Sequence, residues 1–231
     1  MHAYALLNTP PPASDLRLPE GIAGPLTLVH EGALAAIVEL DLDITVLQAD
    51  EAALLQAILG HDRVIHQLFQ QTTILPLRFA VFPTLATLVA HLATHQPHYL
   101  AQLARLAGQA EYTIKLQPLA APEPAIAPEL RGKAYFLAKK QQHLAQERYQ
   151  HQQQTELDGI RQTLARRYPL QWSEESHQAY LLSDQAQSDQ LYAAIAHLQT
   201  QFPTWAIQLG EPLAPFHFVE AISSSGAASQ Q

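Results

Sequence analysis

Residues 61–82 change from a helical to an extended pattern within one short stretch, which constrains the fold more than any other part of the chain. The first half spaces apolar residues as on one face of an α-helix, at Val64, Ile65, Leu68 and Phe69. Residues 72–79 (TTILPLRF) are β-branched, leucine-rich and aromatic, which predicts a strand. The proline inside this strand cannot donate a ladder hydrogen bond, so we expect it at an edge, a bulge or a strand start. The stretch therefore predicts a helix followed directly by such a strand.

Arg78 is the charged residue at the centre of this strand, between Leu77 and Phe79. A guanidinium group keeps its proton, so Arg78 needs a carboxylate partner or a route to water. It could contact an anion or a partner protein, or it could form a structural ion pair, for example with Glu111 on another strand of the same sheet. The structural pair of Arg78 with Glu111 is the favoured interpretation, because a strand arginine between apolar residues usually serves the core.

Residues 1–117 predict one α+β domain. The expected elements are three strands, a helix, a strand, a second helical region and a last strand, at residues 3–7, 26–30, 34–40, 50–68, 74–82, 84–106 and 111–116. A tight turn at residues 30–33 predicts an antiparallel hairpin, and Pro97 predicts a break in the second helical region. This order is typical of a mainly antiparallel sheet with helices on one face.

The second part of the chain predicts a smaller α+β domain. Residues 118–128 contain four prolines and predict a semi-rigid linker. Residues 129–167 contain no proline and predict one long helix or a helical pair. Two strands, a helix and a strand are expected after it, so the second domain is predicted at residues 129–222. Residues 223–231 are of low complexity, and we expect a disordered tail.

Composition and charge exclude several classes of protein. A hydrophobic content of 48% with 15% charged residues is enough to bury a core. The net charge of -8 argues against binding to nucleic acid or to an anionic membrane surface. No apolar run approaches the ~18–20 residues that a membrane span needs, and no basic leader suggests a signal peptide. The absence of cysteine removes disulfides and thiolate metal sites and fits a reducing compartment.

The motifs of catalysis and cofactor binding are incomplete in this sequence. His91 and His95 are one helical turn apart with His98 just beyond, but no HExxH motif occurs, so a solvated histidine face is favoured. Gly132-Lys133 lacks the rest of a phosphate-binding loop. GxGxxG and GxSxG are absent as well. We therefore expect no enzymatic activity, no cofactor and no metal.

Four motifs, in the same order along the chain, resemble those of the gas vesicle protein F/L family (GvpL/GvpF). These are accessory proteins of gas-filled flotation organelles. The central motif is a helix with histidine and valine followed by LPLRF, at His61, Val64, Leu75, Pro76, Leu77, Arg78 and Phe79. Ala80 stands where the family usually has glycine, and residues 108–115 resemble its glycine-x-x-glutamate strand.

The other two motifs lie in the second half of the chain. Residues 131–140, which include Tyr135, resemble the segment that opens the family's second domain. Residues 210–219 resemble a motif that commonly reads GPWPPYxF, in which Leu-Ala here replaces Trp-Pro and Phe216 replaces tyrosine. The candidate interaction residues, taken from the first, third and fourth of these motifs, are His61, Leu75, Pro76, Leu77, Phe79, Tyr135, Pro212, Pro215 and Phe216.

The resemblance implies a non-enzymatic role in buoyancy. A member of this family is expected to be a minor structural or assembly component of gas vesicles, located at these cytoplasmic organelles. Its expected partners are the gas vesicle shell protein A and other gas vesicle accessory proteins. The family also implies two domains, the second a modified ferredoxin-like unit containing the long helix. The alternative is a ligand-binding ferredoxin-like regulatory module, which would need a concave site with convergent polar groups.

Overall fold

The chain consists of two compact units, each with its own four-stranded sheet. The computed structural model describes residues 1–10, 16–42, 50–122, 127, 129–173 and 177–220. Unit 1 comprises Met1–Glu111 and Pro212–Gln231, and unit 2 comprises Tyr112–Glu211. Both units combine antiparallel strand pairs with helices, which confirms the predicted α+β class. None of the helices in the described ranges is long and apolar enough to cross a membrane.

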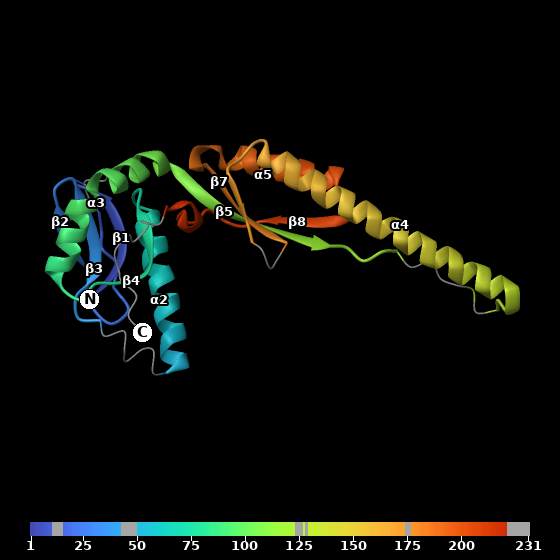
Figure 1. Ribbon diagram of the computed structural model, residues 1–231, viewed down its shortest axis with the longest axis horizontal. Coiled ribbons are helices and arrows are strands. Elements are labelled where there is room, and N and C mark those ends of the chain that lie inside the picture. Colours follow the sequence, from blue (N-terminus) through green and yellow to red (C-terminus); the bar gives the residue numbers. More distant parts are fainter. Residues whose placement is uncertain (11–15, 43–49, 123–126, 128, 174–176, 221–231) are drawn as a thin grey trace. The chain divides into compact units, whose positions relative to one another are not determined.

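Among the described residues, unit 1 has a sheet in the order β2-β3-β1-β4 and two α-helices (Figure 1). Its elements are β1 (His2–Asn8), β2 (Thr27–Glu31), β3 (Leu34–Glu39), α2 (Glu51–Phe69), β4 (Leu75–Val81) and α3 (Leu85–Leu106). The predicted hairpin is confirmed, because β2 and β3 pair antiparallel up to Glu31 opposite Leu34. Gly32 in its turn has φ +57, a conformation that glycine adopts without strain. Helix α2 begins after Asp50, whose carboxylate accepts a hydrogen bond from the Ala52 amide.

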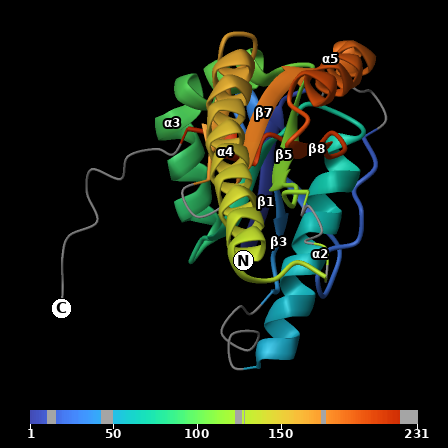
Figure 2. The same ribbon diagram turned by 90° about the vertical axis from the view of Figure 1, so that its right-hand side faces the viewer.

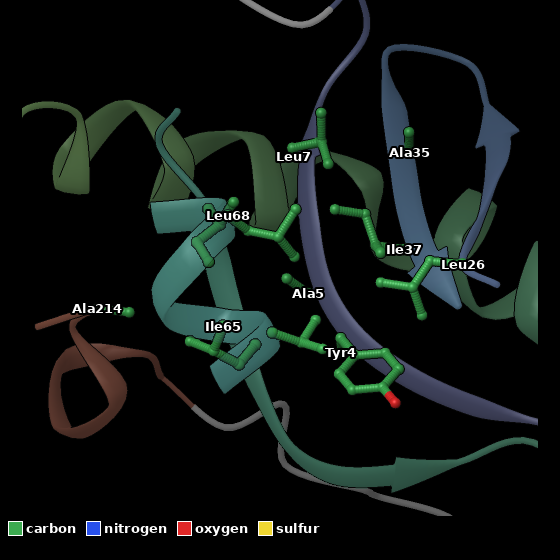
Figure 3. Close-up of a cluster of buried hydrophobic side chains, with 11 residues drawn as sticks. Tyr4, Ala5, Leu7, Leu26, Ala35, Ile37, Ile65, Leu68 and Ala214 are labelled. Carbon is green, nitrogen blue, oxygen red and sulfur yellow. The ribbon is translucent and has the colours of Figure 1, made fainter. Parts of the chain in front are cut away.

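The sheet of unit 1 is covered on both faces, with α2 on one side and α3 on the other (Figures 1 and 2). Ile65 and Leu68 of α2 belong to the same core cluster as Tyr4 and Leu7 of β1 (Figure 3). All six residues of β3 are buried. The expectation of helices on one face is therefore wrong. Strands buried on both faces carry continuous apolar runs rather than an alternating pattern, and β1 and β3 have such runs.

Helix α3 continues through Pro97, where the sequence predicted a break. A proline removes one intrahelical hydrogen bond, the one that would reach the carbonyl of Ala93. Ala93 is exposed, so this carbonyl can be solvated. Buried residues on both sides of the proline, among them Leu92 and Leu103, hold the two parts of α3 to the unit's core. Gly108 with φ +69 follows the end of the helix, a position where glycine is common.

Unit 2 has a sheet in the order β6-β7-β5-β8 and two further α-helices (Figure 1). Its elements are β5 (Gln109–Pro118), α4 (Gly132–Ala165), β6 (Leu170–Trp172), β7 (Gln178–Asp184), the short 3-10 helix η1 (Gln185–Gln187), α5 (Ser188–Gln201) and β8 (Trp205–Leu209). Strand β5 begins in unit 1 and supplies the first strand of this unit. The resulting βαββαβ order, with the first and third strands at the centre of the sheet, is that of a ferredoxin-like domain.

The boundaries of the two units differ from the predicted ones at 1–117, 118–128 and 129–222. Residues 112–117 belong to unit 2, because β5 pairs with β8 along its second half. Residues 212–220 return to unit 1. The proline-rich stretch follows the first strand of unit 2 and does not separate the units. Residues 123–126 and 128 of that stretch, and the whole predicted tail at 223–231, lie outside the described residues.

Helix α4 is a single helix of 34 residues, and its two halves differ in environment. All its buried residues lie in the second half, between Glu156 and Leu164. The first half, residues 132–150, extends past β8 (Figure 1) and is here named the α4 arm. Large apolar side chains are exposed on this arm, namely Tyr135, Phe136, Leu137 and Leu144.

Candidate functional site

The predicted strand at the LPLRF motif contains a bulge. In the pairing of β1 with β4, Ala3 lies opposite Ala80 and Ala5 lies opposite Pro76. Three residues of β4, at 77–79, therefore lie between the two pairs where β1 has a single residue. Such a bulge bends its strand and redirects the side chains on it. Strand β4 is also at the edge of its sheet, so both expectations from the strand proline are confirmed.

His61 of α2 holds this bulge in place. Its Nε2 atom donates a hydrogen bond of 2.9 Å to the carbonyl oxygen of Leu77, and its Nδ1 atom lies 2.9 Å from Nε2 of His2. The ring of Phe79 lies against both imidazoles, with centroid distances of 4.7 Å to His2 and 5.2 Å to His61. Phe79 has φ +34, a strained backbone conformation for a bulky residue. The packed rings and the hydrogen bond together keep the chain in this conformation.

The hydrogen bonds fix the proton positions on both histidines. Because a carbonyl oxygen only accepts, Nε2 of His61 carries a proton, and its Nδ1 accepts from Nε2 of His2. Burial, and then the proximity of His61, lower the pKa of His2 to about 4. Burial also lowers the pKa of His61. Both imidazoles are therefore neutral near pH 7, which matches the hydrogen-bond pattern.

Glu111, the predicted ion-pair partner of Arg78, is buried. It contacts His217 instead. Its carboxylate accepts from the backbone amide of His217 at 2.8 Å and from Nδ1 of the same residue at 2.6 Å. The backbone of Glu111 also exchanges two hydrogen bonds with Leu213. These contacts hold the C-terminal segment, residues 212–220, which contains the short 3-10 helix η2 (Phe216–Phe218).

The predicted ion pair between Arg78 and Glu111 is wrong. The two strands lie in different sheets, because β4 pairs with β1 while β5 belongs to the sheet of unit 2. The bulge turns Arg78 outward, and its side chain is exposed. Within the described ranges Arg78 has neither a hydrogen bond nor an ion pair. The alternative interpretation, a contact with an anion or a partner, is the one that this geometry leaves open.

Helix α3 provides a second attachment for the C-terminal segment. Gln102 is buried and exchanges two hydrogen bonds with the backbone of Glu220, at 2.8 and 3.1 Å. Arg105 donates to the carbonyl oxygen of Phe218 at 2.7 Å and lies 3.3 Å from the carboxylate of Glu220. The segment is thus held at both ends, by Glu111 on one side and by α3 on the other.

A groove of about 340 Å³ lies between the bulge and the C-terminal segment. Its lining comes from β4, from α3 and from the C-terminal segment, namely Pro76, Leu77, Arg78, Tyr99, Phe216, His217, Val219 and Glu220. The hydroxyl of Tyr99 is engaged with Nε2 of His91 at 2.7 Å. Glu220 is engaged with Arg105, so Arg78 is the charged group of the groove without a protein partner among the described residues.

The predicted site residues fall in two places. Those of the LPLRF and C-terminal motifs all lie in unit 1, with Leu75, Pro76 and Pro215 buried and Pro212 partly buried. Tyr135 lies in unit 2, on the exposed α4 arm. Sequence reasoning missed the role of His2, since nothing near it in the chain indicates a partner. His217 lies inside the GPWPPYxF-like motif, so a closer look at that motif could have identified it.

The three histidines that suggested a metal site are engaged elsewhere. His91 contacts the Tyr99 hydroxyl, and Nδ1 of His95 donates to the carbonyl oxygen of His91 at 2.9 Å. His98 lies 2.6 Å from the side-chain amide of Gln102. In the part of the chain that the structure describes, no group of three histidine or acidic residues is arranged to hold a metal ion.

Comparison with known proteins gives one family and one fold. The family model described as gas vesicle synthesis protein GvpL/GvpF matches residues 1–220. The crystal structure of the gas vesicle protein GvpF from Anabaena sp. PCC7120 is similar with a TM-score of 0.67 and 14% identity, over 98% of both chains. That of GvpF from Microcystis aeruginosa has a TM-score of 0.62 and 18% identity, over 95% of this chain and 98% of the other. No curated protein matches this chain.

Proposed function

The chain belongs to the GvpL/GvpF family of gas vesicle synthesis proteins, and from this membership we propose that it is a minor structural or assembly component of gas vesicles that binds their shell protein A. Membership itself implies an association with gas vesicles. The observation that carries the proposal is the extent of the match, because the family model spans residues 1–220 of 231. Both units are therefore part of the family pattern, and the proposed role is non-enzymatic.

We propose that the α4 arm contributes the surface for the shell protein. Phe136 is 70% exposed, and Tyr135 and Leu137 beside it are 47% and 49% exposed. Contiguous exposed apolar side chains are typical of protein-binding surfaces. A shell protein with an apolar gas-facing side is prone to aggregate before assembly, and an arm of this kind could cover that side.

The α4 arm is also basic, unlike the chain as a whole. Its beginning carries Lys133, Lys139 and Lys140, whereas the net charge of the chain is -8. Two kinds of contact are therefore available on one helix, apolar and electrostatic. The chain has few cations overall, so we expect the apolar contacts to dominate the binding of the shell protein.

The test is co-purification of this protein with shell protein A at low and at high salt. Apolar binding should be unchanged or slightly stronger at high salt. An electrostatic interface would weaken, because exposed charges are screened over ~8–10 Å at physiological salt. If co-purification is lost at high salt, the proposed role still holds, but the interface is formed by the lysines of the α4 arm rather than by its apolar side chains. No association at either salt concentration, with normal gas vesicles in a deletion strain, would refute the proposed function.

A double substitution locates the surface. Phe136→Ser with Leu137→Ser should weaken co-purification at least about tenfold, since central apolar anchors contribute most of the binding energy of an interface. The matched control is Leu59→Ser with Leu55→Ser, which removes two similarly exposed leucines from α2. Equal effects of both pairs would show that the arm is not the specific surface.

No specific observation favours the alternative function, a ligand-binding regulatory module. That alternative requires a concave site in the ferredoxin-like domain, which is unit 2. The groove at Arg78 belongs to unit 1. We therefore keep the assembly role as the single proposal.

A further inference from the structure

The groove in unit 1 is lined by one arginine, Arg78. Two other arginines of this unit are engaged, since Arg63 donates to two backbone carbonyls and Arg105 pairs with Glu220. Arg78 lies at the groove with its guanidinium exposed and without a protein partner among the described residues. A guanidinium presents paired N–H donors that match the two oxygens of a carboxylate.

Two buried polar anchors hold the opposite sides of this groove. His61 fixes the bulge on one side through the Leu77 carbonyl, and Glu111 fixes the other side through two hydrogen bonds to His217. Both anchors are nearly inaccessible, at 3% exposure each. The strained backbone of Phe79 lies directly beside Arg78. Strained residues persist where the surroundings enforce them and are concentrated at functional sites.

The rest of the groove is mainly apolar. Leu77, Phe216 and Val219 line it, and the carboxylate of Glu220 is held by Arg105. A volume of about 340 Å³ is at the lower end of the roughly 300–1,000 Å³ typical of ligand sites. It therefore suits one or two amino-acid side chains rather than a whole cofactor.

We propose that this groove binds a short peptide segment of a partner protein in which a carboxylate side chain is flanked by apolar side chains. The carboxylate pairs with Arg78, and a neighbouring apolar side chain packs against Phe216 and Val219. A peptide is favoured over a free small acid because Arg78 is exposed, so an isolated carboxylate would keep most of its hydration and gain little. The inference does not depend on which gas vesicle protein the chain binds.

The test uses the full-length, isotope-labelled chain and two synthetic tripeptides. The first is acetyl-leucyl-glutamyl-leucine amide, and the second replaces the glutamate by glutamine. NMR titration should show shifts of the Arg78 side-chain Nε–H and of the His217 and Val219 amides with the glutamate peptide. The glutamine peptide should bind about tenfold more weakly, because it lacks the charge-assisted pair. Equal affinity of the two peptides, or shifts mapping elsewhere, would overturn the proposal.

Variants at the groove separate binding from folding. Arg78→Gln should remove the preference for the glutamate peptide, whereas Arg17→Gln, at another exposed arginine of unit 1, should leave it intact. Val219→Asp places a negative charge in the groove, which repels the carboxylate of the glutamate peptide. This variant should therefore also abolish binding of that peptide. If Arg78→Gln retains the preference, the proposal is wrong. Sodium propionate binding as tightly as the glutamate peptide would equally overturn the assignment of a peptide.

Discussion

The two units bury ionisable side chains in different ways. In unit 1, Glu39 is 2% exposed and accepts hydrogen bonds from the Tyr4 hydroxyl and from the amides of Ile22 and Ala23. The two histidines behind the bulge and Glu111 are buried in the same unit. In unit 2, the buried carboxylate is Glu156, which accepts from the Thr204 amide and hydroxyl.

The difference follows from how the sheets are covered. The central strands of unit 1 are buried on both faces, so a polar group there reaches no water and must bond to another polar group. On these strands, Glu39 ties the loop at Ile22 and Ala23 to the sheet, and His2 contacts His61. The sides of the groove are held by buried groups outside this sheet, His61 of α2 and Glu111 of β5. In unit 2, Glu156 ties α4 to the turn before β8. Buried polar groups thus hold the sides of the candidate site in unit 1, whereas Glu156 holds the turn before β8 in unit 2.

The largest effect is expected for Glu39→Ala. The substitution removes the carboxylate that accepts from the Tyr4 hydroxyl and from the amides of Ile22 and Ala23, and only the Ile22 amide keeps another acceptor, the Tyr4 hydroxyl oxygen. Losing the acceptor of a buried hydroxyl together with these bonds is costly, so stability should fall by roughly 3–5 kcal/mol. The change in the free energy of unfolding is measured by urea unfolding, monitored with a signal that does not depend on tryptophan, such as circular dichroism. Glu20→Ala removes an exposed carboxylate from the same unit and should cost less than about 0.5 kcal/mol. A similar small loss for both variants would contradict the role assigned to Glu39.

Acid should destabilise unit 1 through His2. Well above pH 6.5, His2 is neutral in both the folded and the unfolded chain, so its protonation does not change the free energy of unfolding there. Because the folded pKa is about 4, only the unfolded chain takes up this proton as the pH falls from 6.5 to about 4. The free energy of unfolding should therefore decrease over this window, by about 3 kcal/mol in total.

His2→Phe provides the comparison for this pH effect. Phenylalanine fills a similar space and does not titrate, so the stability of the variant should depend less on pH between 6.5 and 5. His151→Gln, at an exposed histidine of unit 2, should retain the slope of the parent chain. Identical slopes for the parent and for His2→Phe would show that His2 does not remain neutral in the folded state.

A smaller effect is expected for Glu156→Gln in unit 2. Burial alone would raise the pKa of Glu156, but hydrogen bonds from Thr204 and Gln152 outweigh it, and the pKa is lowered. The ionised carboxylate therefore contributes stability at neutral pH that is lost as the pH falls through its folded pKa. We expect a loss of about 1–2 kcal/mol, with the NMR signals of His217 and Val219 unchanged. Displaced groove signals would mean that the carboxylate of unit 2 also shapes the site.

Sequence periodicity predicted the elements better than their partners. The hairpin of β2 and β3 and the long proline-free helix follow from local turn and propensity signals. Strand β5 also reads clearly as a strand. Its alternation reports which residues face inward, but it does not report which sheet they join. The proline-rich stretch after β5 resembled a domain boundary, so β5 was assigned to the wrong unit.

The candidate site was predicted only in part for the same reason. The LPLRF motif and the last motif were both identified, and the structure brings them to one groove. The bonds that shape the groove link residues far apart, with 59 positions between His2 and His61 and 106 between Glu111 and His217. No local pattern encodes such pairs. Arg78 was assigned to the core because its neighbours are apolar, and the bulge that turns it outward has no signature besides the proline.

The smallest effect on stability is expected at Arg78 itself, where the contrast between buried and exposed charges is sharpest. Arg78→Ala should change the free energy of unfolding by no more than about 0.5 kcal/mol, because the side chain is exposed and has no protein partner among the described residues. His61→Ala, which removes the support of the same bulge, should cost roughly 2–4 kcal/mol, since it leaves the Leu77 carbonyl and His2 without their hydrogen bonds. Urea unfolding of the two variants side by side measures this contrast. A loss of 3 kcal/mol or more in Arg78→Ala would instead show that the guanidinium has a structural partner. If stability is kept while the glutamate peptide no longer binds, the charge at the centre of the motif serves recognition and the histidine behind it serves the fold.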